Sequence, residues 1–151
     1  MISRRQVQRL VAAALAARRN AYCPYSRYPV GAAVLTSSGR IFAGCNVENA
    51  SYGLTLCAER VAMASAIVRR QTELKAACIV GQGARPCGAC RQFLFEFSTP
   101  KTELYLVDVS QNETRPKITR GLVRKMLPWP FDPLASGLLS RPPKYLQGVS
   151  K

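Results

Sequence analysis

The arrangement of three cysteines, in a chain with no histidine, most constrains what this sequence can become. Cys57 stands in the segment Cys-Ala-Glu-Arg, and Cys87 and Cys90 stand further along in Pro-Cys-Gly-Ala-Cys. A structural zinc site takes four protein ligands, whereas a catalytic site takes three and leaves a position open for water. No imidazole can serve as fourth ligand or general base, and Glu59 is the carboxylate beside the cysteines. The pattern predicts a hydrolytic zinc centre.

Both cysteine segments fall at the start of a predicted helix. The unpaired N–H groups and partial positive charge of a helix N-terminus stabilise a thiolate over a thiol. Three thiolates around one Zn²⁺ leave an excess of negative charge, which weakens the metal as a Lewis acid. Arg60 follows Glu59 directly and can offset that charge. The ordinary alternatives are a solvated helix arginine and a first-turn glutamate.

The length and composition are those of one globular domain. The chain has 151 residues, of which 48% are hydrophobic and 20% charged, so it can bury a core. We expect a single catalytic domain over residues 1–139 and a basic, proline-containing tail over residues 140–151. No apolar run reaches the roughly 20 residues that a membrane span requires, so no membrane association is expected.

The three remaining cysteines bear on the compartment in which the protein works. Cys23, Cys45 and Cys78 are widely spaced in apolar or strand-like segments. Such thiols are expected to be reduced and mostly buried, which favours a reducing compartment. We therefore expect a cytoplasmic protein.

The charge of the chain is strongly basic. It has 22 Lys and Arg residues against 8 Asp and Glu residues, a formal net charge of +14. A basic surface attracts polyanions such as nucleic acid. The basic residues are scattered, however, and lack the interleaved aromatic residues of a single-strand binding groove. We expect a solvated basic surface, with nucleic acid as the less favoured alternative.

Hydrophobic periodicity predicts a chain of mixed helices and strands. Residues 3–20 place apolar side chains on one helical face, with Ser3 as the N-cap. A turn at residues 36–39 joins two strands into a hairpin. The expected strands are Tyr28–Leu35, Arg40–Val47, Lys75–Gly81 and Glu103–Val109, and the later helices are Cys57–Arg70, Cys87–Phe97 and Thr119–Leu127.

The two cysteine segments resemble those of the zinc-dependent cytidine deaminases, in the small homotetrameric group of that family. The resemblance extends from about Val7 to Leu134 and includes Met-Leu-Pro-Trp-Pro-Phe-Asp-Pro near its end. It implies an α/β fold of three layers, α/β/α, with a mixed central sheet and helices on both faces. It also implies one Zn²⁺ per subunit and a homotetramer.

The arginine-rich amino-terminal helix admits two interpretations. An amphipathic segment without acidic residues can direct a protein to mitochondria. The resemblance, however, continues without a gap from Val7 to Val34. We therefore expect this helix to be part of the fold.

The resemblance also implies the roles of the site residues. Cys57, Cys87 and Cys90 would bind the zinc ion, and Arg60 would hydrogen-bond the ligand sulfurs. Glu59 would move protons between water, the ring nitrogen and the departing amino group. The implied substrate contacts are Tyr28, Asn46, Glu48, Tyr52, Ala58 and Phe131.

Several of these contacts have specific positions in the family. Asn46 and Glu48 would hold the ribose hydroxyls of a nucleoside. Tyr52 and Phe131 would contact substrate across a subunit boundary. Tyr28 stands where a stacking phenylalanine is common, so its hydroxyl needs a partner if it is buried.

Two further departures from the family pattern concern the rim of the pocket. Asp132 stands where glycine is usual, and the loop before Pro86 is shorter than usual. A glycine with positive φ would be replaced less easily by aspartate. These departures affect substrate preference more than the metal chemistry.

The expected reaction is hydrolytic deamination of cytidine and 2′-deoxycytidine to uridine and 2′-deoxyuridine, a step of pyrimidine salvage. One alternative is a deaminase of RNA, DNA or a nucleoside antibiotic. Asn46 and Glu48 argue against a polynucleotide, because its 3′-oxygen is esterified. The other alternative is a non-catalytic zinc or nucleic-acid-binding module, and three metal cysteines rather than four argue against it.

Overall fold

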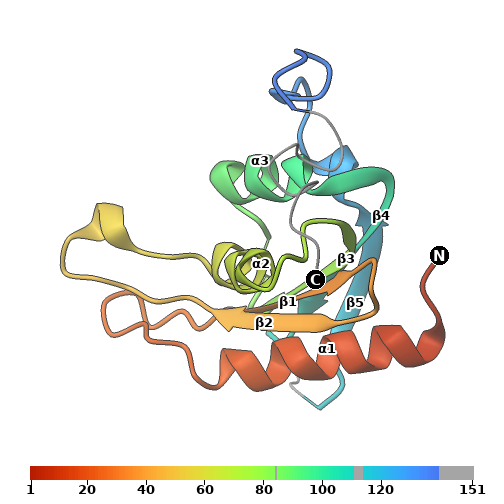
Figure 1. Cartoon of the computed structure of the whole chain (residues 1–151). Coiled ribbons are helices and arrows are strands. Elements are labelled where there is room, and N and C mark those ends of the chain that lie inside the picture. Colours follow the sequence, from red (N-terminus) through yellow and green to blue (C-terminus); the bar gives the residue numbers. More distant parts are fainter. Residues whose placement is uncertain (84, 111–113, 140–151) are drawn as a thin grey trace.

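A five-stranded mixed sheet forms the middle of the protein (Figure 1). The computed structural model describes residues 1–83, 85–110 and 114–139. The strand order is β2-β1-β3-β4-β5; β3 and β4 are parallel, and the other neighbouring pairs are antiparallel. The strands are β1 (Gly31–Thr36), β2 (Ile41–Cys45), β3 (Leu74–Gly81), β4 (Ser98–Asp108) and β5 (Lys117–Leu122).

Helices cover both faces of the sheet (Figure 1). α1 (Arg4–Arg18) packs on one face, and α2 (Ala58–Val68) and α3 (Gly88–Glu96) pack on the other. The short 3₁₀ helices are η1 (Tyr52–Leu54), which precedes α2, and η2 (Val123–Met126), which follows β5. The predicted three-layer α/β/α fold with a mixed sheet is confirmed.

The amino-terminal helix is held to the sheet by its apolar face. The Ser3 hydroxyl accepts a hydrogen bond from the N–H of Gln6 at 3.2 Å, and the Gln6 side chain accepts one from the N–H of Ser3 at 2.9 Å. This reciprocal pair caps α1. Leu10 and Ala14 are fully buried against the sheet. The helix is therefore part of the core, as the sequence predicts.

α2 approaches the sheet closely because its buried face carries small side chains. Ala62 and Ala66 are fully buried. A Cβ atom at Gly44 of β2 would lie 2.6 Å from the backbone nitrogen of Ala62, so this crossing requires glycine. The close packing fixes the position of the first turn of α2, which carries Cys57 as its N-cap.

The predicted helix over Thr119–Leu127 is wrong. This stretch instead forms the end of β5 and then η2. β5 pairs with β4 along its length, with Ile118 opposite Val107. The β-branched Ile118 and Thr119, together with Gly121, disfavour a helix. The open edge of β4 supplies the backbone partners that a local reading of the sequence misses.

Other boundaries differ by a few residues. The strand expected from Tyr28 begins at Gly31. β4 begins at Ser98 rather than Glu103, because Ser98 already pairs with Leu74 of β3. The early start of β4 lengthens the parallel contact at the centre of the sheet.

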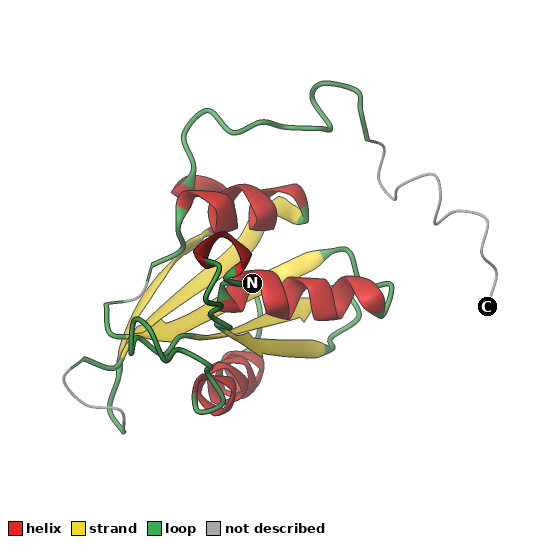
Figure 2. Ribbon diagram, turned by 90° about the vertical axis from the view of Figure 1, so that its left-hand side faces the viewer, coloured by secondary structure: helices red, strands yellow, loops and turns green. Residues whose placement is uncertain are grey.

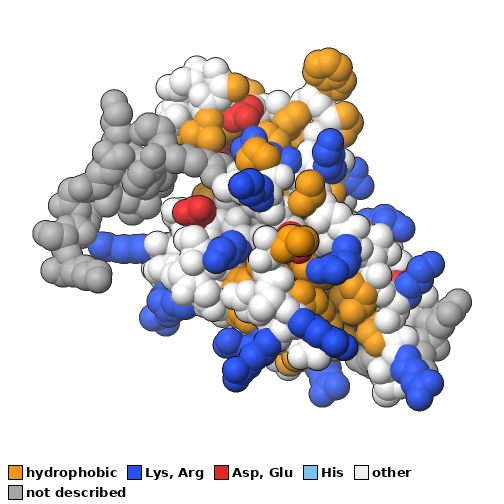
Figure 3. Space-filling model, turned by 90° about the vertical axis from the view of Figure 1, so that its right-hand side faces the viewer, with side chains coloured by type: hydrophobic (Ala, Val, Ile, Leu, Met, Phe, Trp, Pro, Cys, Tyr) orange, Lys and Arg blue, Asp and Glu red, His pale blue; other side chains and the backbone are white. Residues whose placement is uncertain are grey.

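Among the described residues, no helix is long and apolar enough to cross a membrane. Residues 127–139 run as a loop away from the layers (Figure 2). The predicted tail over residues 140–151 lies outside the described residues. Basic side chains are spread across the face of the molecule that Figure 3 shows.

Candidate metal centre

Two helix N-termini bring three cysteines together. Cys57 is the N-cap of α2, and Cys87 is the N-cap of α3, with Cys90 in the first turn after it. Neither N-cap side chain makes a capping hydrogen bond, so both sulfurs are available as ligands. The N-cap and the third residue of a helix lie close together, which is why Cys-x-x-Cys supplies two ligands here. The three Sγ atoms lie within 4.8 Å of one another.

The electrostatics of the three sulfurs favour a bound cation. Contact with Cys90, and then with Arg60, lowers the pKa of the Cys57 thiol to about 5. The same contact with Cys57, together with burial, raises the pKa of Cys90. The Cys57 thiolate thus suppresses the ionisation of Cys90, and a bound cation would relieve that repulsion.

The donor set fits zinc. Thiolates are preferred zinc ligands, and metal binding drives their deprotonation. Within the described ranges, the potential metal cluster at this point consists of Cys57, Cys87 and Cys90 and no further residue. Three protein ligands are the number found in catalytic rather than structural zinc sites.

The remaining cysteines have a different character. All six cysteines of the chain are free thiols. Cys78 is fully buried in β3, and burial raises its pKa to about 12. Cys23 and Cys45 are half-buried, so the expectation of buried thiols holds fully only for Cys78.

Glu59 lies in the first turn of α2, two residues after the Cys57 ligand position. Glu59 is buried, with only 5% of its surface exposed. Burial, followed by the negative charge of Cys57, raises the pKa of its carboxyl group. A carboxyl group with a raised pKa beside a hydrolytic metal site is suited to both accepting and donating a proton.

Arg60 supports the sulfur cluster from the same helix turn. Its Nη2 donates to the carbonyl oxygen of Thr55 at 2.8 Å and to Cys57 Sγ at 3.9 Å. The contact with Cys57 raises the pKa of the guanidinium, which stays charged. Among the described residues, its buried Nε has no hydrogen-bond partner. This arrangement places a fixed positive charge beside the thiolates.

A pocket that contains the carboxylate of Glu48 lies near the start of α2. Glu48 is nearly buried, and its Oε2 accepts hydrogen bonds from the N–H groups of Tyr25 at 2.9 Å and Ser26 at 3.2 Å. The interaction with Ser26 lowers the pKa of the Glu48 carboxyl group. The pocket has a volume of about 290 Å³ and is lined by Tyr25, Ser26, Glu48, Tyr52 and Thr55.

Asn46 and Tyr28 secure the backbone beside this pocket. The Asn46 amide accepts from the N–H of Val30 and donates to the carbonyl of Tyr28, both at 2.9 Å. The Tyr28 hydroxyl donates to the carbonyl of Gln82 at 2.5 Å. Burial raises the pKa of Tyr28. The hydroxyl thus has a partner and ties the segment before β1 to the residue that follows β3.

The other predicted contacts are divided between the interior and the surface. Ala58, the first residue of α2, is fully buried. Tyr52 is 75% exposed, although its ring meets that of Tyr25 edge-on with centroids 5.8 Å apart. Phe131 is 61% exposed and does not line the pocket beside Glu48. Within one subunit, the structure therefore does not bring Phe131 to that pocket.

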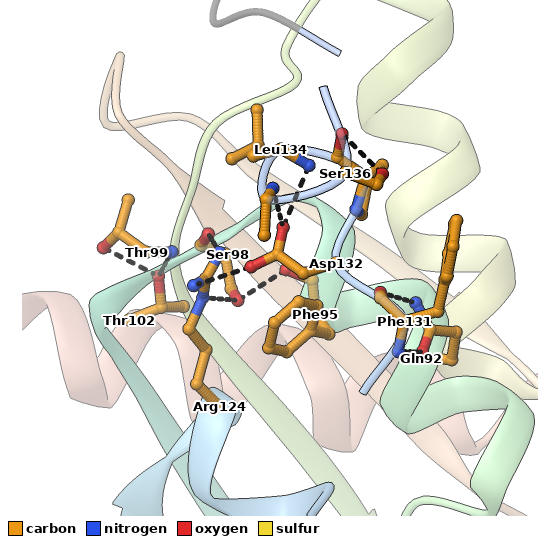
Figure 4. A network of polar contacts seen from close by, with 12 residues as sticks. Gln92, Phe95, Ser98, Thr99, Thr102, Arg124, Phe131, Asp132, Leu134 and Ser136 are labelled. Atoms are coloured by element: carbon orange, nitrogen blue, oxygen red, sulfur yellow. Dashed lines mark hydrogen bonds and ion pairs between the residues drawn. The ribbon is translucent and has the colours of Figure 1, made fainter. Parts of the chain in front are cut away.

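The backbone of Phe131 is held by a side chain that sequence analysis missed. Gln92 of α3 donates to the carbonyl of Phe131 at 2.8 Å and accepts from its N–H at 3.2 Å (Figure 4). Arg91, the preceding residue, donates to the carbonyls of Pro86 at 2.8 Å and Met126 at 3.0 Å. The Arg-Gln pair directly after Cys90 thus links the ligand loop to the carboxyl-terminal segment.

The contacts of Asp132 explain why an aspartate can stand at this position. Its Oδ1 accepts from the N–H groups of Leu134 at 3.0 Å and Ala135 at 3.3 Å, and its Oδ2 lies 3.7 Å from the guanidinium of Arg124 (Figure 4). The φ angle of Asp132 is not positive; in this segment Trp129 has the positive φ, at 51°. The aspartate therefore organises the turn after Phe131 without backbone strain.

Comparisons with known proteins identify relatives along most of the chain. The model for the cytidine and deoxycytidylate deaminase zinc-binding region matches residues 4–106. A cytidine deaminase of Sporosarcina psychrophila is 40% identical over 128 residues, covering 83% of this chain and 90% of that protein. One of Halalkalibacterium halodurans is 46% identical over 102 residues, covering 66% and 77%. The crystal structure of cytidine deaminase from Burkholderia pseudomallei superposes with a TM-score of 0.75 at 39% identity, covering 86% of this chain and 100% of that one.

Proposed function

The chain belongs to the cytidine and deoxycytidylate deaminase family, and from this we infer that it catalyses zinc-dependent hydrolytic deamination of cytidine and 2′-deoxycytidine. The products are uridine or 2′-deoxyuridine and ammonia. The observation that carries this function is the cluster of three sulfurs within 4.8 Å, with the buried Glu59 two residues after one of them.

Cys57, Cys87 and Cys90 are the proposed ligands of the zinc ion. When bound, zinc supplies a water nucleophile by lowering the pKa of that water towards neutrality. Arg60 holds positive charge against the Cys57 sulfur. This contact withdraws negative charge from the ligand sulfur and so would keep a bound zinc ion electrophilic.

Glu59 performs the proton transfers in this proposal. Its carboxylate accepts the proton that the water loses and delivers it to N3 of the cytosine ring. The oxygen attacks C4, the carbon that bears the amino group. Glu59 then takes the remaining proton of the water-derived hydroxyl and delivers it to the departing amino group, which leaves as ammonia. The buried position of Glu59 and its raised pKa support both directions of transfer.

The proposed substrate is a free nucleoside. Glu48 and Asn46 hold the ribose hydroxyls, and Tyr28, Ala58, Tyr52 and Phe131 contact the substrate. The location of Glu48 in a pocket supports its role. The Asn46 side-chain amide makes two hydrogen bonds to the backbone, one as donor and one as acceptor. One N–H and one oxygen lone pair therefore stay available to bind a ribose hydroxyl.

We propose that the protein is a homotetramer and that it works in the cytoplasm. Tyr52, Leu54, Trp129 and Phe131 are large apolar side chains that are more than half exposed in one subunit. Exposed apolar groups of this size are typical of surfaces that another protein covers. The six free thiols suit a reducing compartment.

The function is tested by incubating purified protein with cytidine and recording the fall in absorbance as uridine forms. We expect turnover that a chelator abolishes and that added Zn²⁺ restores. Cytidine consumption that is unaffected by complete metal removal would contradict the zinc mechanism. No turnover of cytidine or 2′-deoxycytidine by the zinc-loaded protein would contradict the assigned substrate.

A further inference from the structure

A second charged region lies at the end of the sheet away from the metal centre. The Gln82 carbonyl that holds Tyr28, and the Cys87 segment, follow the carboxyl end of β3. The second region lies where β3 begins and draws on four separate parts of the chain. Its basic residues, which we call the basic end, are Arg4, Arg5, Arg40, Arg69, Arg70, Lys75 and Lys101.

Hydrogen bonds assemble these parts into one surface. The N–H of Ser37 donates to the carbonyl of Glu73 at 2.9 Å, and the Ser38 hydroxyl donates to Gln71 at 2.5 Å. These bonds join the turn before Arg40 to the segment that follows α2. The Thr102 hydroxyl donates to the carbonyl of Leu74 at 2.8 Å and so places the Lys101 loop beside the same segment.

The start of α1 is fastened to the same end of the sheet. The N–H of Ile2 donates to a carboxylate oxygen of Glu103 at 2.5 Å. Glu103 pairs with Ala76 near the beginning of β3. Arg4 and Arg5, both exposed, follow directly in the first turn of α1. The basic end is therefore a property of the folded chain and cannot be read from any one segment.

The positive charge of this surface is not neutralised within the described part of the chain. All seven side chains belong to exposed residues, and no ion pair joins them to a described carboxylate. The acidic residues Glu48, Glu103, Asp108 and Asp132 instead bind groups of the protein itself. Glu73 is the exposed carboxylate within the basic segments.

The chemistry of the surface suits the binding of phosphate groups. Arg and Lys bind phosphates through charge-assisted hydrogen bonds. The exposed large apolar residues adjoining these segments are Met1 and Val68; neither is aromatic, so the segments offer no exposed ring to stack on a base. We propose that the basic end binds the phosphate backbone of a nucleic acid without reading its sequence.

The proposal is tested by fluorescence anisotropy with a labelled 20-base-pair DNA duplex over a series of salt concentrations. The test variant is Arg40→Glu with Arg70→Glu. The matched control is Arg19→Glu with Arg27→Glu, which makes the same charge change away from the basic end. Each pair includes one arginine with positive φ, Arg70 or Arg27, so the backbone cost is matched.

We expect the parent protein to bind with a steep salt dependence. The test variant should bind at least roughly tenfold more weakly and reduce the slope of log K against log salt by about 2, whereas the control should change affinity less than about threefold. The test variant should deaminate cytidine at the parent rate. The assay therefore separates this proposal from the proposed function.

Several outcomes would overturn the proposal. One is no duplex binding at low salt, and another is an equal loss in both variants, which would indicate net charge alone. A third outcome comes from measuring binding to vesicles that contain phosphatidylserine. If the test variant loses vesicle binding but keeps DNA binding, the basic end binds an anionic membrane instead of nucleic acid.

Discussion

The metal centre and the carboxyl-terminal segment are built in contrasting ways. At the metal centre, two helix N-termini fix the three ligands: Cys57 is the N-cap residue of α2, and Cys87 is that of α3, with Cys90 in the first turn. In the segment after η2, the backbone of Phe131 is held by Gln92 of α3, which lies 39 residues away in the sequence. Helix-terminal geometry allows the ligand positions of the first region to be predicted from the sequence. The position of Phe131 in the second region depends instead on a contact with a residue far away in the sequence.

The largest expected effect tests the local region. Cys90→Ala removes one of three clustered sulfurs, so the variant should lose bound zinc and all chelator-sensitive deamination. Zinc content is measured by atomic absorption together with turnover of cytidine. Cys45→Ala is the control, because this half-buried thiol lies outside the cluster and its loss should leave zinc content unchanged. A fully zinc-loaded Cys90→Ala protein would break the assignment of this ligand.

A smaller effect is expected for the cation beside the cluster. Arg60→Gln removes the positive charge next to Cys57 Sγ, and groups that support metal ligands contribute roughly 10- to 100-fold to affinity or activity. Zinc affinity from a chelator titration should fall in that range, together with kcat. Arg69→Gln, at the exposed end of the same helix, is the control. Equal behaviour of the two variants would mean that Arg60 is an ordinary surface arginine.

The next effect tests the long-range region. Gln92→Ala removes both hydrogen bonds to the backbone of Phe131, each of which contributes on the order of 1 kcal/mol. We expect a several-fold rise in KM for cytidine with zinc content unchanged. In a double-mutant cycle with Phe131→Ala, the two losses should not add. Additive losses would mean that Gln92 does not act through Phe131.

The smallest effect concerns stability. Asp132→Gly removes acceptors for two backbone N–H groups and the ion pair with Arg124, so the free energy of unfolding should fall by about 1 kcal/mol. Urea denaturation measures this change. Ser136→Ala, which removes one hydrogen bond to Pro133, should cost less. A more stable Asp132→Gly protein would show that the aspartate does not organise the turn.

The same contrast explains what could be predicted from the sequence. The family resemblance implies the fold class, and the starts of α1, α2 and α3 and the cysteine cluster follow from motifs and short-range periodicity; the structure confirms them. The helix over Thr119–Leu127 fails because its true partner is the edge of β4, the preceding strand, and an edge strand as exposed as β5 carries little of the apolar alternation that marks a strand. Gln92 and the basic end were missed for another reason, because their contacts form only when segments far apart in the sequence come together on folding.

The most direct test of the central claim is the variant Glu59→Gln, which keeps the shape of the side chain but removes its proton chemistry. We predict that it retains one zinc ion per subunit, as measured by atomic absorption, and that kcat for cytidine falls by roughly 10²- to 10⁴-fold. A zinc-loaded Glu59→Gln protein that deaminates cytidine at the parent rate would contradict the account.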